Sequence, residues 1–362
     1  MNKITIIAGA RPNFIKIAPI IHAILKAKSS GIKINYRLVH TGQHYDKNMS
    51  GSFFDELQIP APNNNLMCRG GSQSEQTANI MIAFEKELLS NPAELVLVVG
   101  DVNSTMACAI VAQKLKSKVA HVEAGIRSGD WSMPEEINRL VTDSITNYFF
   151  TTSKTANKTL IESGVNKENI YFVGNTMIDT LLKQQPNFIR PSIWNDLNLK
   201  AKNYCVITLH RPANVDEEKI LKDLVNEIIL NSENLPLIFP MHPRTKAIFK
   251  KLNITHSRLH VLPPLSYLEF NYIVERSKVV ITDSGGITEE TTVMGVPCMT
   301  LRDNTERPET ITEGTNELIG TNPKAIAPAF KKLLSNKWKT GKIPELWDGK
   351  AAERIVEIIT KI

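Results

Sequence analysis

The stretch Lys278–Gly295, KVVITDSGGITEETTVMG, predicts a buried strand, a tight turn and a helix in immediate succession. The strand is expected at Val279–Thr282 and the helix from Ile287 onward. A turn of this kind presents unpaired backbone N–H groups at a helix N-terminus, where the helix dipole favours an anion. Ser284 can add a hydroxyl, and the two glycines after it allow a ligand to approach the backbone closely. The stretch is therefore typical of a phosphate site, although an ordinary strand-to-helix turn has the same pattern.

Strand–helix alternation extends over the whole chain. Amphipathic patterns such as Ile15–Lys28 and Ser74–Leu89 separate short apolar runs that have the length and composition of buried strands. These strand candidates are Ile4–Ala8, Asn35–His40, Leu95–Gly100, Val119–Val122, Tyr148–Thr152, Tyr171–Val173, Cys205–Leu209, Leu237–Pro240, Leu259–Leu262, Val279–Thr282 and Cys298–Leu301. Strands that alternate with helices are typical of doubly wound parallel sheets. We therefore expect an α/β fold with two Rossmann-like domains that face each other across a cleft.

A break in the alternation indicates a domain boundary. The segment Lys183–Trp194 carries prolines among polar residues and has no strand or helix pattern, which predicts a linker. We expect one domain at residues 1–182 and a second at residues 183–346. The last segment, Gly349–Ile362, has isoleucines at helical spacing. Its apolar face must dock somewhere, and a return to the first domain is one option.

Composition and charge narrow the class of protein. The 362 residues have a hydrophobic fraction of 42% and a charged fraction of 22%, as in ordinary globular proteins. The net charge of +6 comes without long runs of Lys or Arg, which favours an anionic small ligand over nucleic acid. The four cysteines, Cys68, Cys108, Cys205 and Cys298, lie far apart and predict buried thiols in a reducing compartment. Without a signal-like or bilayer-spanning apolar run, we expect a cytoplasmic protein with no membrane partner.

Polar residues concentrate where the predicted strands end. These residues are Arg11, His40, Gln43, His44, Asp101, His121, Glu123, His210, Arg211, His242 and Asp283. In parallel sheets, ligands bind outside the carboxyl ends of the strands. The sequence therefore predicts an active site between the two domains.

The types of these side chains indicate the chemistry. Arg11 and Lys16 form a cationic pair beside a helix start, which suits a diphosphate, although a solvated turn has the same composition. Asp101 and Glu123 each follow an apolar strand, where a carboxylate either acts chemically or caps the next helix. The chain has no G-x-G-x-x-G, G-x-x-x-x-G-K-[ST], G-x-S-x-G or H-E-x-x-H motif. These features favour acid–base chemistry on a nucleotide-linked substrate.

Eight ordered motifs carry a resemblance to a known family. They are GARPNFIK at Gly9–Lys16, TGQH at Thr41–His44, GDVNST at Gly100–Thr105, HVEAGIRSGD at His121–Asp130, MPEEINR at Met133–Arg139, VGNTMIDTLL at Val173–Leu182, TDSGGITEE at Thr282–Glu290 and RDNTERPETITEGT at Arg302–Thr315. In this order and spacing the chain resembles the non-hydrolysing UDP-N-acetylglucosamine 2-epimerases of bacteria. The resemblance covers essentially the whole chain.

The resemblance implies a fold and an activity. The fold is the glycosyltransferase-B arrangement, with a C-terminal helix at residues 347–362 that crosses back to the first domain, in a homodimer. The activity is interconversion of UDP-N-acetylglucosamine and UDP-N-acetylmannosamine for surface polysaccharide precursors, through elimination of UDP to 2-acetamidoglucal and re-addition. The family needs neither metal nor nicotinamide, so no cofactor is expected.

The resemblance also implies roles for individual residues. Those matching the catalytic positions are Asp101, Glu123, Glu135 and His210. Those matching the UDP site are Arg11, Lys16, Phe270, Ser284, Gly285, Gly286, Glu290 and Arg307. A second UDP-N-acetylglucosamine, an activator in many members, would contact Gln43, Arg69, Glu136, Arg211 and His242.

The chain departs from the family pattern at several positions, so more than one UDP-sugar substrate is compatible with the sequence. Pro212 and Ala213 follow His210-Arg211 where many members have Arg-Glu, and the helix start at Pro134 lacks an aromatic insertion. These departures lie near the activator positions. Alternatives are therefore a 2-epimerase of UDP-2,3-diacetamido-glucuronate and a UDP-sugar glycosyltransferase of the same fold. A UDP-sugar sensor would share the binding residues without using the three acids.

Overall fold

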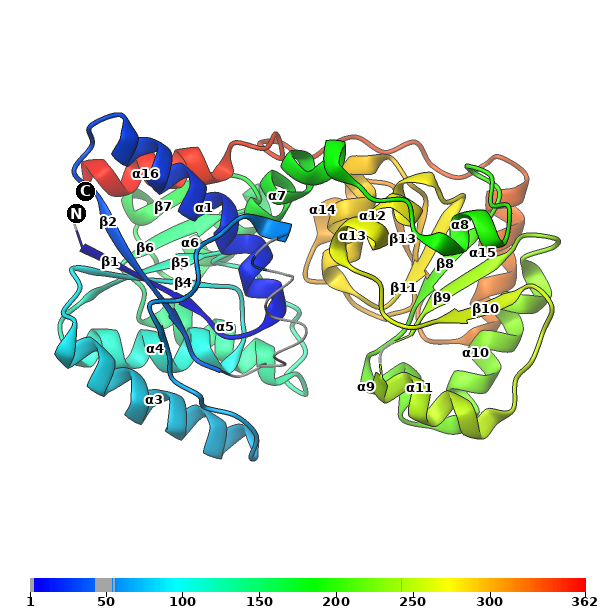
Figure 1. Ribbon diagram of the computed structural model, residues 1–362, viewed down its shortest axis with the longest axis horizontal. Helices are drawn as coiled ribbons and strands as arrows, with labels where there is room; N and C mark the ends of the chain where they lie inside the picture. Colours follow the sequence, from blue (N-terminus) through cyan, green and yellow to red (C-terminus); the bar gives the residue numbers. More distant parts are fainter. Residues whose placement is uncertain (1–2, 43–53, 55, 242) are drawn as a thin grey trace. The chain divides into compact units, whose positions relative to one another are not determined.

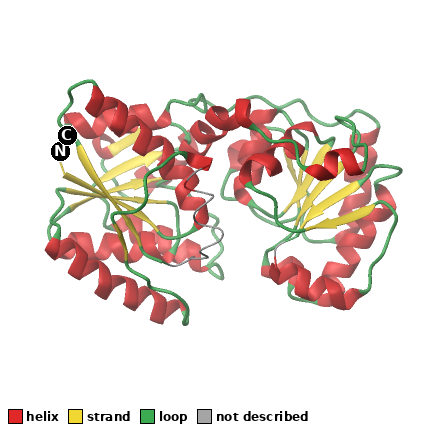
Figure 2. Ribbon diagram, in the orientation of Figure 1, coloured by secondary structure: helices red, strands yellow, loops and turns green. Residues whose placement is uncertain are grey.

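The computed structural model describes residues 3–42, 54, 56–241 and 243–362, and the chain divides into two compact units. The first unit comprises Met1–Lys183 and Glu345–Ile362, and the second comprises Gln184–Pro344. Each unit is a parallel sheet with helices on both faces (Figures 1 and 2). The α/β fold class expected from the sequence is thereby confirmed.

The first unit contains a seven-stranded sheet in the order β3-β2-β1-β4-β5-β6-β7, with parallel pairing throughout. Its strands are β1 (Lys3–Ala8), β2 (Asn35–His40), β3 (Asn64–Asn65), β4 (Leu95–Val99), β5 (Lys118–Val122), β6 (Tyr148–Thr151) and β7 (Ile170–Phe172). Its helices are α1 (Arg11–Ser29), α3 (Gln73–Ser90), α4 (Asn103–Lys114), α5 (Pro134–Ser144), α6 (Lys154–Glu162), η1 (Lys167–Asn169), α7 (Thr176–Gln184) and α16 (Ala351–Lys361). Helices α3, α4 and α5 pack in succession, and α1 lies beside α16 (Figure 1).

The second unit contains a six-stranded parallel sheet in the order β10-β9-β8-β11-β12-β13. Its strands are β8 (Cys205–Thr208), β9 (Leu237–Pro240), β10 (Leu259–Leu262), β11 (Val279–Thr282), β12 (Cys298–Thr300) and β13 (Asn316–Leu318). Its helices are η2 (Gln185–Asn187), α8 (Ser192–Asp196), α9 (Pro212–Val215), α10 (Glu218–Asn231), α11 (Pro243–Phe249), η3 (Lys250–Leu252), α12 (Tyr267–Arg276), α13 (Gly285–Met294), α14 (Pro308–Thr312), η4 (Pro323–Ala325) and α15 (Ile326–Leu334).

Alternate residues of the strands in the second unit face different cores. Ile207, Phe239 and Ile281 join a cluster that includes apolar residues of α10 and α15. Their neighbours Val206 and Val280 join a second cluster with residues of α12. Successive strand side chains point to opposite faces, and both faces are covered. This explains why the strands are continuous apolar runs rather than alternating patterns.

Several element boundaries differ from those expected. Helix α1 begins at Arg11 rather than Ile15, because Pro12 fits the first turn of a helix. Helix α13 begins at Gly285 rather than Ile287, so both glycines of the turn belong to the helix. The short strands β3 and β13 have no apolar run that would have indicated them.

The segment Lys183–Trp194, where a linker is expected, begins where the chain passes from the first unit to the second, between Lys183 and Gln184, and it contains regular structure. This segment contains the end of α7, then η2 and the start of α8, and it packs on the second unit. Arg190 Nε donates to the Tyr272 hydroxyl at 3.0 Å, and the Trp194 ring lies edge-on to the rings of Tyr204 and Tyr272. The aromatic contacts stabilise a segment whose prolines and polar residues suggested an open chain.

The C-terminal helix α16 docks on the first unit, as expected. Asp179 of α7 accepts hydrogen bonds from the backbone N–H groups of Ala351 and Ala352 at 3.1 and 2.7 Å. The Trp347 indole is buried and donates to the Thr152 carbonyl at 3.0 Å. The two bonds to Asp179 satisfy N–H groups of the first turn of α16, which have no partner within the helix.

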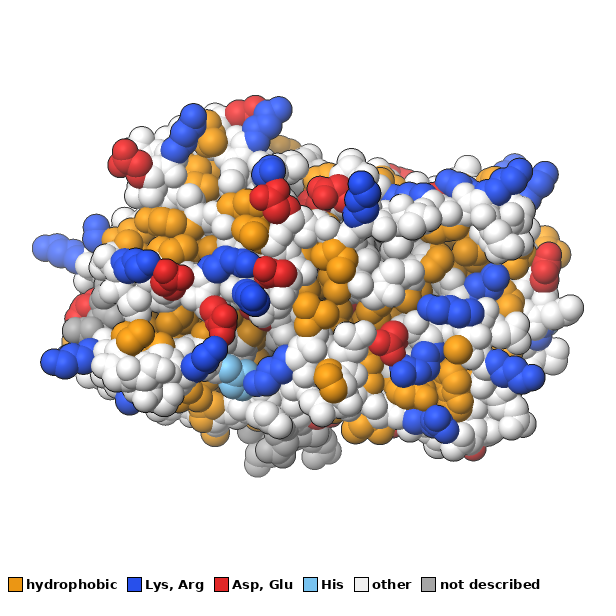
Figure 3. Space-filling model, turned by 90° about the horizontal axis from the view of Figure 1, so that it is seen from above, with side chains coloured by type: hydrophobic (Ala, Val, Ile, Leu, Met, Phe, Trp, Pro, Cys, Tyr) orange, Lys and Arg blue, Asp and Glu red, His pale blue; other side chains and the backbone are white. Residues whose placement is uncertain are grey.

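The state of the cysteines and the distribution of surface charge agree with the composition of the sequence. All four cysteines are free and buried, as expected. Figure 3 shows lysine and arginine side chains scattered over the face in view, with acidic side chains between them. None of the described helices combines the length and the apolar composition that crossing a membrane requires.

Candidate active site

Two acidic residues, Asp101 and Glu123, lie just after the ends of two adjacent strands in the sheet of the first unit. Strands β4 and β5 pair with Val99 opposite Val122, and Gly100 N donates to the Val122 carbonyl at 3.0 Å. Glu123 follows β5 directly, and Asp101 follows β4 after Gly100. Gly100 has φ +68°, which glycine adopts easily. Glu123 has φ +71°, which is uncommon for a residue with a side chain and is concentrated at functional sites.

Glu123 forms a buried ion pair with Lys16. The Lys16 Nζ lies 2.7 Å from Glu123 Oε2, and the two side chains are 12% and 2% exposed. A Cβ atom on Gly100 would lie 3.3 Å from the same Nζ, so glycine also makes room for the lysine. Asn13 of α1 accepts from the N–H groups of the β1–α1 turn and donates to the Val99 carbonyl at 3.1 Å. The lysine expected at a diphosphate is thus beside a catalytic candidate.

Asp101 is held by a buried arginine of α5. Arg139 Nη2 and Nε donate to Asp101 Oδ2 at 2.6 and 3.0 Å. The Asp101 side chain is 30% exposed, so it is far more accessible than that of Glu123. Asn138 of the same helix donates to the Asp101 carbonyl at 2.8 Å. Asp101 therefore combines a fixed geometry with access to a ligand.

Glu136 is engaged in holding the loop before α5. Its carboxylate accepts from the backbone N–H groups of Ser128 and Gly129 at 2.9 and 3.0 Å, and from Arg139 Nη1 at 2.7 Å. Burial alone would raise the pKa of Glu136, but these hydrogen bonds outweigh it and lower the pKa. Its neighbour Glu135, in the first turn of α5, is half-buried, and its side chain forms no hydrogen bond to the described residues.

Other predicted residues of the first unit are placed as follows. Arg69 is exposed, and its Nη2 lies 3.8 Å from the sulfur of Met67. Arg11 begins α1, but its side chain is outside the described part of the structure. Gln43 and, in the second unit, His242 also lie outside the described residues.

In the second unit, His210 is bound to a buried aspartate. Strands β8 and β11 are neighbours, and His210 Nδ1 lies 2.9 Å from Asp283 Oδ1. Asp283 also accepts from Arg211 N at 2.9 Å and Asn214 Nδ2 at 3.1 Å. Burial raises the pKa of Asp283, but the histidine and the N–H donors outweigh it, so the pKa is lowered. The ionised carboxylate requires a proton on Nδ1, which leaves Nε2 for a ligand.

The start of α13 lies among charged side chains. Ser284 is its N-cap. Charged side chains lie close to the next residue, since a Cβ atom placed on Gly285 would be 3.8 Å from Glu306 Oε2 and 4.0 Å from Arg302 Nη1. Arg302 forms two hydrogen bonds to Glu306 at 2.6 and 2.8 Å. Arg211 Nη2 lies 3.5 Å from Glu306 Oε1. Two arginines and the carboxylate that they share thus lie near this helix start, whose N–H groups favour an anion.

A group of buried acids follows along α13. The Tyr267 hydroxyl donates to Glu290 Oε1 at 2.8 Å, and Glu289 is paired with Arg307 Nε. Burial raises the pKa of Glu290 to about 7. Burial likewise raises the pKa of Glu309, on α14, to about 7. Phe270 lies on α12, the helix of Tyr267, and is half-buried.

Sequence reasoning missed the residues that hold these groups in place. Asn13, Arg139 and Asp143 in the first unit, and Arg302 and Glu306 in the second, are buried and charged or polar. Each lies within a motif or helix already considered. The sequence contains a signal for such residues: a polar residue on the inner face of a helix, or directly after a buried strand, needs a hydrogen-bonding partner.

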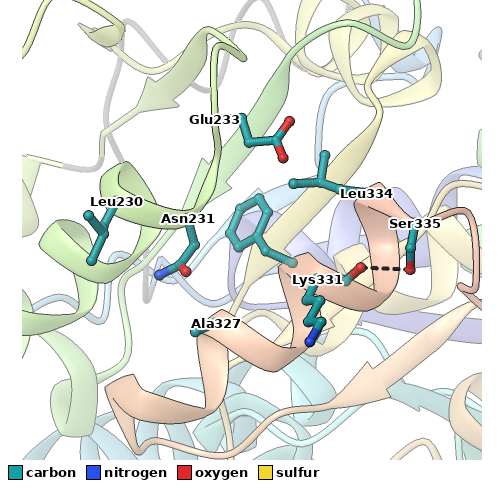
Figure 4. A pocket seen from close by; sticks show the side chains of 8 residues that line it. Leu230, Asn231, Glu233, Ala327, Lys331, Leu334 and Ser335 are labelled. Carbon is teal, nitrogen blue, oxygen red and sulfur yellow. Dashed lines mark hydrogen bonds between the residues drawn. The ribbon is translucent and has the colours of Figure 1, made fainter.

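The groove in Figure 4 lies away from these groups. It is lined by Leu230, Asn231, Glu233, Ala327, Phe330, Lys331, Leu334 and Ser335. These residues lie on α15 and directly after it, and at the end of α10 and shortly after it. A helix that connects parallel strands ends at the amino-terminal edge of the sheet, opposite the edge that binds ligands. The groove is therefore no part of the candidate site.

Two doubly wound units, with carboxylates and a histidine at their strand ends, define an α/β enzyme that acts on a phosphorylated ligand. The family model for UDP-N-acetylglucosamine 2-epimerase matches residues 26–360. The chain belongs to this family.

Relatives support the assignment over the full length. The UDP-N-acetylglucosamine 2-epimerase of Methanocaldococcus jannaschii is 41% identical, with 99% of each chain covered. A crystal structure of the Methanocaldococcus jannaschii UDP-GlcNAc 2-epimerase in complex with UDP-GlcNAc and UDP aligns with a TM-score of 0.90 at 40% identity, over 99% of this chain and 100% of that one. The UDP-2,3-diacetamido-2,3-dideoxy-D-glucuronate 2-epimerase of Pseudomonas aeruginosa is 36% identical, over 99% and 100% of the two chains.

Proposed function

We propose that this protein interconverts UDP-N-acetylglucosamine and UDP-N-acetylmannosamine. The family match over the whole chain supports this reaction. The observation that carries it is the pair of carboxylates, Asp101 and Glu123, at the adjacent ends of β4 and β5. Epimerisation at C2 needs proton transfer on two faces of the sugar, and therefore more than one acid–base group.

The proposed chemistry is elimination and re-addition of UDP. The hydrogen at C2 is not next to a carbonyl, so its removal alone is difficult. A carboxylate takes it as the bond between C1 and the UDP oxygen breaks, which leaves 2-acetamidoglucal and UDP. A proton is then delivered to C2 from the opposite face, and the UDP oxygen attacks C1. Asp101, Glu123 and Glu135 are the proposed acid–base set.

The second unit supplies groups suited to UDP. The helix start at Ser284, Gly285 and Gly286 offers N–H donors to a phosphate, with Arg307 of the following motif as a cation. Glu290 would accept hydrogen bonds from the ribose hydroxyls, and Phe270 would pack on the uracil. His210, with its Nδ1 on Asp283, would stabilise the departing diphosphate through Nε2. Arg11 and Lys16 would add positive charge from the first unit.

Regulation by a second UDP-N-acetylglucosamine is a further part of the proposal. Its proposed contacts are Gln43, Arg69, Glu136, Arg211 and His242. Glu136 and Arg211 have hydrogen bonds within their own units, so a second ligand would share these groups rather than find them open. A homodimer in the cytoplasm is the proposed form of the protein.

A related sugar is the second candidate. The relative that acts on UDP-2,3-diacetamido-2,3-dideoxy-D-glucuronate is 36% identical over the full length, which is close to the 41% of the first. Its substrate would place an extra carboxylate and amide near residues where this chain departs from the family pattern, such as Pro212.

One incubation separates these possibilities. The protein is mixed with UDP-N-acetylglucosamine alone, and the products are followed by proton NMR. Formation of UDP-N-acetylmannosamine without an acceptor is the expected result. Turnover only with UDP-2,3-diacetamido-glucuronate identifies the second candidate, and activity only with an added acceptor identifies a glycosyltransferase. Binding without turnover of any sugar indicates a sensor and contradicts the proposal.

A further inference from the structure

His121, near the end of β5, is fully buried and has an acceptor at each ring nitrogen. Nδ1 lies 2.7 Å from Asp143 Oδ1 of α5. Nε2 lies 2.8 Å from the carbonyl oxygen of Gly100, the residue before Asp101. The ring therefore bridges the helix that carries Glu135 and the turn that carries Asp101.

The two acceptors determine where the protons are. A carbonyl oxygen only accepts, so Nε2 must donate to Gly100. Asp143 Oδ2 accepts from Gly125 N at 3.0 Å and from Arg127 Nη1 at 2.6 Å, which stabilises the carboxylate. Oδ1 is then an acceptor too, and Nδ1 must also donate.

We propose that His121 is an imidazolium and acts as a positioning residue. Its ring holds the turn that carries Asp101 in place relative to α5 and to the end of β5. The catalytic part of this inference rests on the proposed function. The same helix holds the other side of the turn, because Arg139 binds the Asp101 carboxylate and Asn138 binds its carbonyl. Loss of the bridge would leave the turn bound to β5 only through the hydrogen bond from Gly100 N to the Val122 carbonyl.

The cations on the neighbouring elements are Arg127, Arg139 and Lys16. Arg127 comes from the loop after β5 and shares Asp143 with the ring. Arg139 on α5 is paired with Asp101 and Glu136, and Lys16 on α1 is paired with Glu123. Arg139 and Lys16 thus have carboxylates of their own, whereas Arg127 and His121 bind one oxygen each of the same carboxylate, Asp143.

NMR of the wild-type protein tests the charge directly. The chain has eight histidines, and ¹⁵N labelling with loss of one signal in His121→Gln assigns this ring. At about pH 8, where an unperturbed histidine is neutral, both nitrogens of His121 are expected to be protonated. A neutral ring at that pH overturns the proposal, whether or not the protein is an epimerase.

A second variant separates charge from hydrogen bonding. In Asp143→Asn, the amide can donate to Nδ1 while its oxygen accepts from Gly125, so the packing is preserved. His121 is then expected to become neutral and to keep its donor to Gly100. A ring that stays doubly protonated in this variant shows that Asp143 is not the partner that holds the charge, and contradicts the assignment.

Activity tests the positioning role. His121→Phe removes both donors and is expected to lower kcat by about 10²-fold, the usual cost of misplacing a catalytic group by an ångström. UDP affinity should be unchanged, because the proposed UDP groups lie mainly in the second unit. His121→Gln, which can still donate to Gly100, should recover part of kcat, and the exposed His256→Gln is the matched control. Unchanged kcat in His121→Phe overturns the role; if that variant does not fold, His121→Gln and Asp143→Asn decide it. Absence of any epimerase activity in the wild type would refute the proposed function instead.

Discussion

His210 and Asp283 reach each other from the ends of two adjacent parallel strands, with 2.9 Å between Nδ1 and Oδ1. The aspartate is fully buried, whereas the histidine side chain is 49% exposed. The exposed ring is thereby held in one orientation and one tautomer by a partner that solvent does not reach. This pairing of a buried carboxylate with an accessible imidazole is a recurrent way to prepare a histidine for chemistry.

The first prediction concerns this pair. Asp283→Asn is expected to lower kcat by about 10²-fold, because the amide no longer requires Nδ1 to donate. His210→Asn should lower kcat by a similar factor, and the double variant should be little worse than either single one. Steady-state kinetics on all three measure this. Fully additive losses would show that Asp283 acts independently of His210.

The second prediction concerns proton transfer at C2. In heavy water, deuterium should enter C2 of the product sugar, which proton NMR detects. Asp101→Asn, Glu123→Gln and Glu135→Gln should each slow exchange and epimerisation by about 10²-fold or more. UDP affinity should be retained in all three.

The exposed Glu85→Gln on α3 is the matched control and should behave as wild type. Product formed in heavy water with hydrogen still at C2 would indicate internal hydride return and exclude elimination.

The third prediction concerns the pH dependence of UDP binding. Ribose hydroxyls donate to a carboxylate, so the ionised form of Glu290 binds best. Since burial raises its pKa to about 7, affinity should fall as the pH drops below that value. The Tyr267 hydrogen bond opposes burial and lowers the pKa. Tyr267→Phe should therefore move the midpoint to higher pH.

Calorimetry with uridine avoids the titration of the phosphates. Glu290→Gln is the control, and its uridine affinity should be weaker and nearly independent of pH in this range. The same midpoint in wild type and Tyr267→Phe would show that the tyrosine does not act through Glu290.

The fourth prediction concerns the stability of the α16 contact. Burial raises the pKa of Asp179 from 3.8 to about 6, against two backbone hydrogen bonds that lower it. The folded protein therefore binds the proton more tightly than the unfolded chain. The contribution of this group to the free energy of unfolding should rise as the pH falls from about 7 towards 4, by up to about 3 kcal/mol.

Urea unfolding of wild type and Asp179→Asn measures this difference at each pH, so that other titrating groups cancel. The variant should be less stable at about pH 4, since one N–H of α16 loses its acceptor, and its disadvantage should shrink as the pH rises to 7 and Asp179 of the wild type ionises. A difference that does not change with pH would contradict the raised pKa.

The regular part of the fold could be predicted because its strands are covered on both faces. Such strands are continuous runs of Val, Ile and Leu, like Leu95–Val99. The two-residue strand Asn64–Asn65 has no such run and depends on pairing with β2. The regular structure within Lys183–Trp194 could not be predicted, because Trp194 packs on Tyr272, which lies far along the chain, as well as on the nearer Tyr204.

The site could be predicted in its residue types but not in its pairings. Lys16 and Glu123 are 107 positions apart, and only the sheet brings them together. Helix α5 reverses the usual pattern, because Arg139 and Asp143 are buried while Ile137 is 45% exposed. Polar residues on the inner face of a helix contradict hydrophobic periodicity, and such contradictions are expected at functional sites.

The docking of α16 also has a consequence for synthesis of the protein on the ribosome. The first unit is the first to emerge, yet α16, which packs beside α1, is translated only after all of the second unit. During that interval the apolar surface of α1 has no cover, and Asp179 has no helix to cap. A nascent chain of this topology completes its N-terminal unit last, so chaperones are expected to bind α1 until the final residues leave the exit tunnel.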